Sequence, residues 1–442
     1  ENPHGTTHWP RPVGLGRPRR RAVTLRLTPV EQAMLDGSEG EGVALAMRIV
    51  TGLARVRGAE ELVDVTGARI DSCLYHGRAG LDFAEKLVDL GARVRVPTTL
   101  NVGSLDLLHP GTVRADAEHP ELLTAGRALM DAYVALGART TFTCAPYQVD
   151  ARPAVGEHVA WAESNAIVFA NSVLGARTDR YGDFLDISAA ITGRAPRAGF
   201  HLDEARRADV VLDVTAVAPE RWHDEAWYAV LGYLLGRQAR SRVAAIVGLP
   251  ATTSEDDLKA LGAAAASSGG VGIFHAVGVT PEAPMLESVL AHSDPAVHKL
   301  SDADLAAGRR ELCTADGGRI DAVSLGTPHA SLAEIRALTE EVERTRTTVA
   351  TGVTAYLSTG RGVLALAEAA GLIAPLERAG FRIVVDTCTY LVPILPAGTR
   401  VVMTNSGKWA HYAPGNLGID VVIGTLAECV RAAGAGRVVL DD

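Results

Sequence analysis

Short β-rich runs alternate with helical segments along most of this 442-residue chain. The runs that carry this pattern are 92–96, 140–143, 209–214, 244–247, 271–274, 321–325, 382–385 and 401–403. Alternation of single strands with helices is typical of parallel sheets covered by helices on both faces. The pattern therefore predicts an α/β protein built from doubly wound lobes.

The length of the chain exceeds what one hydrophobic core usually organises, so we expect more than one lobe. Composition shifts near residues 205 and 295 are the best candidate boundaries. The first 25 residues hold four prolines and an arginine cluster between 17 and 21, without apolar periodicity. We predict a flexible arm or linker over 1–25 and a folded region over 26–442.

Two capping-box patterns mark helix starts inside the folded region. Thr28 is followed by Pro29 and by Glu31 three residues on, which predicts that ordered structure begins there. Ser331 and Glu334 repeat the spacing and predict a helix over 332–346.

The composition narrows the function classes. A hydrophobic fraction of 47% with 21% charged residues is typical of a soluble globular protein, and the net charge of −9 argues against nucleic-acid binding. We find no apolar run long enough to span a bilayer and no signal peptide. Five scattered cysteines do not resemble a disulfide framework, so we expect a reducing, cytoplasmic location.

Polar or small residues follow six of the predicted strands. These loops are 97–101, 144–147, 275–282, 326–329, 386–388 and 404–408. The carboxyl ends of parallel strands meet at one edge of a sheet, where open α/β proteins bind ligands. The loops therefore predict a shared crevice, although a single polar loop would be unremarkable.

Cys144 and Cys388 each end one of these strand-like runs. Thiolates at such positions are the usual ligands of iron–sulfur clusters. The alternative is a small buried hydrophobe, which is how most free cysteines behave. Cys73 lies in the polar run 70–77, which places it between a cluster ligand and a buried hydrophobic residue.

Ser406 lies in the run Thr-Asn-Ser-Gly-Lys. Its hydroxyl either caps a helix or acts as a base or nucleophile whose pKa is lowered by Lys408 and by backbone N–H groups. The segment 163–178 predicts a helix that carries Ser164 and Asn165, with Arg177 just beyond its end. An arginine there suits a carboxylate or phosphate, whereas the alternative is internal hydrogen bonding between lobes.

Together these residues resemble the large catalytic part of the aconitase X family, a divergent branch of the aconitase superfamily. The stretches that carry the resemblance are 31–42 (EQAMLDGSEGEG), 96–101 (VPTTLN), 143–147 (TCAPY), 163–178 (ESNAIVFANSVLGART), 326–329 (GTPH), 386–388 (DTC) and 404–412 (TNSGKWAHY). The resemblance spans residue 28 to about 420. It implies an aconitase-like fold with α/β lobes around a central active-site cleft, and dehydration of a small hydroxy acid with an iron–sulfur cluster.

Two further stretches, 70–77 and 181–196, are similar to the cis-3-hydroxy-L-proline dehydratase branch. The reaction expected from this resemblance removes the proton at C2, expels hydroxide from C3 and yields Δ1-pyrroline-2-carboxylate after tautomerisation. The alternative is mevalonate 5-phosphate dehydratase, which would call for more cationic residues. A third alternative is a non-enzymatic iron- or RNA-responsive relative, against which the charge of −9 argues.

The resemblance also implies a cluster and its ligands. Cys144 and Cys388 are the implied ligands. Thr327 stands where the phosphate-substrate branch carries a cysteine, which leaves Cys73 as the natural third ligand. Within the resemblance, this departure at Thr327 favours a 2Fe–2S cluster over a 4Fe–4S or 3Fe–4S cluster.

Roles for other residues follow from the same resemblance. We expect Ser406 to be the catalytic base, assisted by Lys408. The expected substrate-binding residues are Thr98, Thr99, Asn101, His76, Tyr147, Ser164, Asn165 and Arg177. The family also uses a small swivelling β-rich domain, which we expect as a separate subunit or as a fused domain missing from this chain.

Overall fold

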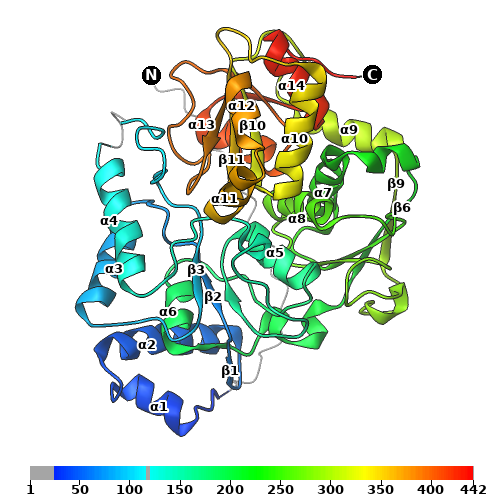
Figure 1. Cartoon of the computed structure of the whole chain (residues 1–442). Coiled ribbons are helices and arrows are strands. Elements are labelled where there is room, and N and C mark those ends of the chain that lie inside the picture. Colours follow the sequence, from blue (N-terminus) through cyan, green and yellow to red (C-terminus); the bar gives the residue numbers. More distant parts are fainter. Residues whose placement is uncertain (1–23, 116–119, 442) are drawn as a thin grey trace, which may run out of the picture.

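The structure is a computed structural model that describes residues 24–115 and 120–441 (Figure 1). Within them, strands form three parallel sheets of three, four and five strands and one antiparallel pair. Helices separate the strands along the chain. The predicted α/β fold class is confirmed.

The first region runs to about residue 204 and contains the smallest parallel sheet, in the order β3-β2-β4. Strands β1 and β5 form the antiparallel pair beside it. The strands are β1 (Leu62–Asp64), β2 (Ala68–Ile70), β3 (Thr98–Leu100), β4 (Ala160–Trp161) and β5 (Arg194–Pro196). The helices are α1 (Pro29–Asp36), α2 (Glu41–Arg57), α3 (Arg78–Asp89), α4 (Leu122–Ala135), α5 (Ser164–Ser172), α6 (Leu185–Thr192) and the short 3₁₀ turns η1 (Pro146–Gln148), η2 (Gly199–His201) and η3 (Asp203–Arg206).

The second region holds a parallel sheet in the order β8-β7-β6-β9. Its strands are β6 (Val210–Ala216), β7 (Ala244–Val247), β8 (Phe274–Ala276) and β9 (Ala296–Ser301). Its helices are α7 (Glu225–Ala239), α8 (Glu255–Gly269), α9 (Asp302–Leu312) and the 3₁₀ turns η4 (Pro219–His223) and η5 (Leu286–Ser288). Helices α7 and α8 touch backbone to backbone, since a Cβ on Gly232 would lie 2.1 Å from the Leu261 carbonyl oxygen.

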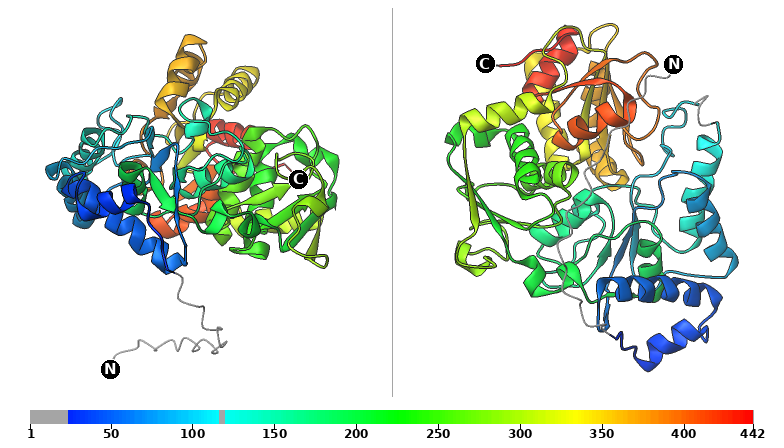
Figure 2. Two further views of the ribbon diagram at one scale, coloured as in Figure 1. Left: turned by 90° about the horizontal axis from the view of Figure 1, so that it is seen from below. Right: turned by 180° about the vertical axis from the view of Figure 1, so that it is seen from behind.

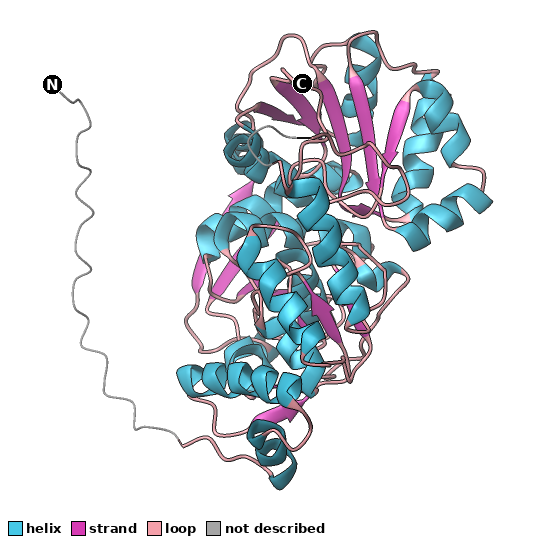
Figure 3. Cartoon of the chain, turned by 90° about the vertical axis from the view of Figure 1, so that its left-hand side faces the viewer, coloured by secondary structure: helices cyan, strands magenta, loops and turns pink. Residues whose placement is uncertain are grey.

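The third region holds the largest sheet, in the order β12-β11-β10-β13-β14, with helices on both sides of it (Figure 3). Its strands are β10 (Ala322–Ala330), β11 (Thr354–Thr359), β12 (Phe381–Val384), β13 (Val401–Thr404) and β14 (Asp420–Ile423). Its helices are α10 (Leu332–Thr345), α11 (Arg361–Ala369), α12 (Ile373–Ala379), α13 (Gly407–Leu417) and α14 (Leu426–Ala435). Figure 2 shows, from below and behind, that the three regions meet around a common centre.

Most of the predicted strands are present. The runs 209–214, 244–247, 321–325, 382–385 and 401–403 fall on β6, β7, β10, β12 and β13, and the run 271–274 overlaps β8 only at its end. The strand predicted at 92–96 is wrong. There the N–H groups of Val94 and Arg95 donate to the carbonyl oxygens of Leu136 and Ala190, at a helix end and inside a helix, so no ladder forms before Thr98.

The strand predicted at 140–143 is also wrong. Phe142 has a φ of 40°, which breaks an extended run. The hydroxyl of Thr141 bonds both to the N–H and to the carbonyl oxygen of Leu100, replacing ladder hydrogen bonds with a side chain. Cys144 therefore follows an irregular segment that is tied to the end of β3.

Both predicted helix starts are confirmed. The Thr28 hydroxyl accepts from the Glu31 N–H and the Glu31 carboxylate accepts from the Thr28 N–H, which completes a capping box. Ser331 and Glu334 do the same for α10, which ends at Thr345.

The predicted arm lies outside the described residues, apart from residues 24 and 25. Leu25 packs against the core, and the Arg26 N–H donates to Glu60 at 2.8 Å. Among the described residues, we find no helix with both the length and the apolar character needed to cross a bilayer.

Candidate active site

A cavity of about 290 Å³ lies between the first and the third region. Its lining residues are Asp71, Leu74, His76, Asn101, Val102, Cys144, Glu163, Ser164, Asp183, Thr327, Cys388, Tyr390, Leu391, Lys408 and Tyr412. Five of the six predicted loops contribute to it. The loop 275–282 does not, and His275 instead bonds to the Arg206 carbonyl oxygen at 2.7 Å.

Two buried thiols face each other at this cavity. Ligand atoms of Cys144, Cys388 and His329 all lie within 4.8 Å of one another. Burial raises the pKa of Cys144, but the hydrogen bond from the Cys388 thiol and the nearby His329 outweigh burial and lower that pKa to about 5. The same bond, together with burial, raises the pKa of Cys388 well above its usual value. The lowered pKa favours the thiolate form of Cys144, and thiolates are what iron binds.

His329 supports this pair from behind. Its backbone N–H donates to the Cys144 sulfur at 3.1 Å. Its ring is held at both nitrogens, with Nδ1 3.0 Å from the Thr143 hydroxyl and Nε2 3.2 Å from the Thr387 carbonyl oxygen. A carbonyl only accepts, so Nε2 carries the proton. The orientation of the His329 ring is therefore fixed by hydrogen bonds at both nitrogens. In the sequence, His329 belongs to the predicted loop 326–329.

The donor set fits an iron–sulfur group. Two thiols converge on one wall of the cavity, and such sulfurs are the ordinary ligands of these clusters. Thr327, which is 6% exposed, lines the same cavity, and its hydroxyl has no hydrogen-bond partner among the described residues. Buried polar atoms nearly always have a hydrogen-bond partner, so this hydroxyl fits a site that accommodates a bound group.

Cys73 lies one layer behind the cavity wall. Its thiol donates to the carbonyl oxygens of Asn101 and Val102 at 3.2 and 3.6 Å, and burial followed by the charge of Asp71 raises its pKa well above the usual value. In the described structure it does not join the group of Cys144, Cys388 and His329. Its role as third ligand stays a prediction.

Lys408 and Glu163 form a buried ion pair across the cavity. Glu163 caps α5, where its carboxylate accepts from the N–H groups of Asn165 and Ala166 at 3.0 and 2.7 Å, and its Oε1 also contacts the Lys408 ammonium. Burial disfavours the charged form of both side chains, but the attraction between the two opposite charges outweighs this effect. The pKa of Glu163 is therefore lowered and that of Lys408 raised. The pair joins the starts of α5 and α13.

We expect Lys408→Met to lower the free energy of unfolding by about 3–5 kcal/mol, because it leaves the Glu163 carboxylate buried without its counter-ion. Urea denaturation measures this. The double variant Glu163→Gln/Lys408→Met should recover most of the loss. The exposed pair Arg78–Asp82 is the matched control, and Arg78→Met should cost no more than about 1 kcal/mol. Equal losses at the two pairs would contradict the buried-pair account.

Ser406 is the N-cap of α13. Its hydroxyl accepts from the Trp409 N–H at 3.0 Å, and the residue is 6% exposed. It lies two residues before Lys408, whose ammonium pairs with Glu163. The capping role foreseen as the alternative is therefore present, and the role as base stays a prediction.

The other predicted binding residues divide into those at the cavity and those behind it. His76, Ser164 and Asn101 line it. Asn165 lies behind, where its amide donates to the Tyr147 hydroxyl and to the Cys144 carbonyl oxygen at 2.9 and 3.1 Å. These two residues therefore position the Cys144 loop.

Thr98, Thr99 and Arg177 do not line the cavity. Thr98 and Thr99 are buried in β3, and the Thr98 hydroxyl donates to the Val96 carbonyl oxygen. Arg177 pairs with Asp203 and donates to the His201 carbonyl oxygen at 3.1 Å. Arg177 thus makes internal hydrogen bonds, but both partners lie in the first region and the bonds do not join two lobes.

Sequence reasoning missed the acidic groups of the cavity. Of its Asp, Glu, Lys and Arg side chains, three are acidic (Asp71, Glu163 and Asp183) and one, Lys408, is basic. Burial and then the charge of Glu163 raise the pKa of Asp71 to about 6. Asp71 belongs to the run 70–77, and the polar residues of that run were the sequence signal that could have identified it as a site residue.

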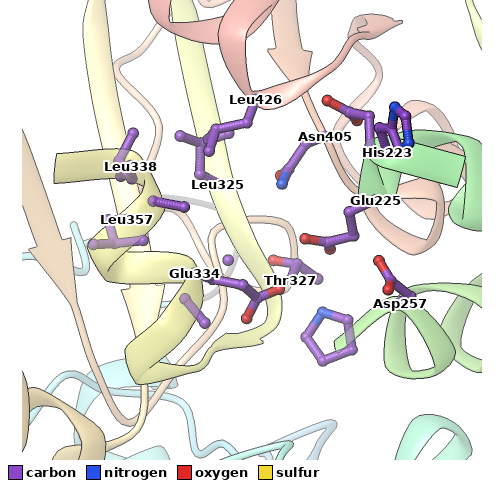
Figure 4. A pocket seen from close by; sticks show the side chains of 15 residues that line it. His223, Glu225, Asp257, Leu325, Thr327, Glu334, Leu338, Leu357, Asn405 and Leu426 are labelled. Atoms are coloured by element: carbon purple, nitrogen blue, oxygen red, sulfur yellow. The ribbon is translucent and has the colours of Figure 1, made fainter. Parts of the chain in front are cut away.

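Thr327 also lines a second cavity of about 250 Å³ (Figure 4). Carboxylates from the starts of three helices surround it, among them Glu225 of α7 and Glu334 of α10. Burial and then the charge of Glu334 raise the pKa of Glu225 well above its usual value. No thiol lines this second cavity, so the candidate chemistry lies with Cys144 and Cys388.

Family models match nearly the whole described chain. They are the first domain of aconitase X over residues 24–204, the second over 208–309 and the third over 320–435.

Curated relatives fall into two groups. The chain is 46% identical to a cis-3-hydroxy-L-proline dehydratase of Pseudomonas aeruginosa and 41% to one of Hypocrea jecorina, over 93% of this chain and 70% and 69% of those proteins. It is 37% identical to a phosphomevalonate dehydratase large subunit of Methanothermobacter thermautotrophicus, over 92% of this chain and 98% of that one. All three are dehydratases, which are carbon–oxygen lyases.

A solved structure is similar throughout. It is the holo-form of aconitase X from Thermococcus kodakaraensis, with a TM-score of 0.82 and 31% identity over 92% of this chain and 100% of that chain. The family models and these relatives agree with the resemblance predicted from the sequence. The chain belongs to the aconitase X family.

Proposed function

We propose that this carbon–oxygen lyase dehydrates cis-3-hydroxy-L-proline to Δ1-pyrroline-2-carboxylate. The observation that carries the proposal is the charge of the cavity, where three carboxylates face one lysine that is already paired with Glu163. Such a lining suits a substrate with an ammonium group and disfavours a phosphate dianion. The higher identity to the two hydroxyproline dehydratases supports the same choice.

The reaction needs a base at C2 and help for the departing hydroxide at C3. Ser406 is the proposed base, because its hydroxyl lies at the start of α13 among oriented N–H groups. Cys144 and Cys388 would hold an iron–sulfur cluster, with Cys73 as the proposed third ligand and two irons as the proposed size. When bound, that cluster supplies a Lewis acid for the leaving oxygen.

The Glu163–Lys408 pair ties the start of α5 to the start of α13, so both helix starts keep a fixed position at the cavity. Leu74 and Leu391 supply apolar surface for the ring methylenes. We also propose that a small swivel domain takes part, supported by the name of the relative that is a large subunit. The cytoplasmic location stays a prediction.

A substrate panel tests this proposal. The anaerobically purified, iron-loaded protein, with and without a small-subunit partner, would be given cis-3-hydroxy-L-proline, trans-3-hydroxy-L-proline and mevalonate 5-phosphate. We expect turnover of the cis isomer only, detected as Δ1-pyrroline-2-carboxylate. Turnover of mevalonate 5-phosphate in its place would reject the proposal and favour the function named for the relative from Methanothermobacter thermautotrophicus.

A further inference from the structure

The carboxylate of Asp71 is held in one orientation by a chain of hydrogen bonds. The amide N–H of Asn101 donates to Asp71 Oδ1, and the Asn101 amide oxygen accepts from the Arg69 guanidinium at 2.6 Å. Arg69 is fully buried and also donates to the Thr143 carbonyl oxygen, so it is fixed in turn. Asp71 therefore presents a prearranged carboxylate to the cavity.

The other two carboxylates of the cavity are engaged differently. Both oxygens of Glu163 are occupied, Oε1 by Lys408 and the Asn165 N–H and Oε2 by the Ala166 N–H. Asp183 is exposed, and desolvation of its carboxyl raises its pKa, an effect that the nearby His76 only partly offsets. Within the described residues no donor reaches Asp71 Oδ2, although the side chain lines the cavity. That oxygen is open to a ligand.

The chemistry of the proposed substrate matches this oxygen. A cyclic amino acid carries a secondary ammonium with two N–H donors and one positive charge, and hydrogen bonds between charged groups are about twice as strong as neutral ones. Leu74 and Leu391 line the same cavity and can cover the ring carbons beside the nitrogen. A phosphorylated hydroxy acid offers no such donor.

We infer that Asp71, positioned by Asn101 and Arg69, binds the ring ammonium of the substrate and selects cyclic amino acids over hydroxy acids without nitrogen. This inference rests on the proposed function. It also reassigns Asn101, which the sequence suggested as a direct substrate contact, to a positioning residue for Asp71.

Calorimetric binding of two non-reacting ligands tests the inference. L-proline has the ammonium and cyclopentanecarboxylate lacks it, while ring size and carboxylate are shared. Wild-type, iron-loaded protein should bind L-proline about 10- to 100-fold more tightly. Asp71→Asn should bind the two ligands equally, whereas Asp71→Glu should regain part of the preference because the charge returns.

Each other outcome overturns the inference. An unchanged preference in Asp71→Asn, or a wild type without preference, removes Asp71 from the ammonium site. Loss of affinity for both ligands alike in Asp71→Asn and Asp71→Glu would assign a merely structural role. Asp183→Asn is the matched control in the same cavity and should keep the preference. Since no turnover is measured, a failure of the proposed dehydration appears only in the substrate panel.

Discussion

Cys144→Ser and Cys388→Ser should each abolish dehydration and bound iron together. The two thiols are buried, hydrogen-bonded to each other and at the wall of the cavity. A serine hydroxyl is a poor iron ligand, and a metal Lewis acid contributes several kcal/mol to such a step. We expect kcat to fall by about 10³-fold or more. Iron per chain and visible absorption after anaerobic purification measure the loss of the group independently of activity.

Cys313→Ser is the control for these two variants. Cys313 is partly exposed and lies at the end of α9, away from the cavity lining. It should keep both iron and activity. Cys73→Ser tests the predicted third ligand in the same assay. Normal iron content and absorption in Cys144→Ser would refute the assignment of this thiol.

Ser406→Ala should lower kcat by about 10²- to 10⁴-fold, which is the usual contribution of a positioned general base. Iron content and absorption should stay as in the wild type, because the hydroxyl bonds to the Trp409 N–H and to neither thiol. The expected signature is a protein that is coloured but inactive.

The loss of a helix cap has to be separated from the loss of a base. Thr425 caps α14 with the same kind of hydrogen bond, which its hydroxyl accepts from the Glu428 N–H. Neither Ser406 nor Thr425 lines the cavity, but Ser406 lies two residues before Lys408, which does. Thr425→Ala should cost about 1 kcal/mol of stability and leave kcat unchanged. If Ser406→Ala loses only that stability and keeps its activity, Ser406 is a cap and not the base.

The sequence predicted the fold class because strand and helix signals alternate strongly in the second and third regions. It failed at 92–96 and 140–143, where apolar and β-branched residues occur without a partner strand. Thr141 shows the reason, since its hydroxyl takes over backbone bonds that a ladder would otherwise make. Such a tertiary contact has no local signature.

The site was predictable where a residue type carries its own chemistry. Cys144 and Cys388 are rare thiols in polar loops, and both line the cavity. Asp71 and Glu163 were missed, because carboxylates are common and only the fold reveals that Asp71 lies against Asn101 and that Glu163 is buried against Lys408. Arg177 was predicted to bind substrate because of its charge, but it forms an ion pair with Asp203.

Iron dependence of hydroxyproline turnover tests the central claim most directly. Iron and sulfide would be removed from the wild-type protein by chelation and then restored stepwise under anaerobic conditions. The rate of Δ1-pyrroline-2-carboxylate formation from cis-3-hydroxy-L-proline should be zero without iron and rise in proportion to the iron bound, up to about two per chain. Full turnover by colourless, iron-free protein would contradict the account.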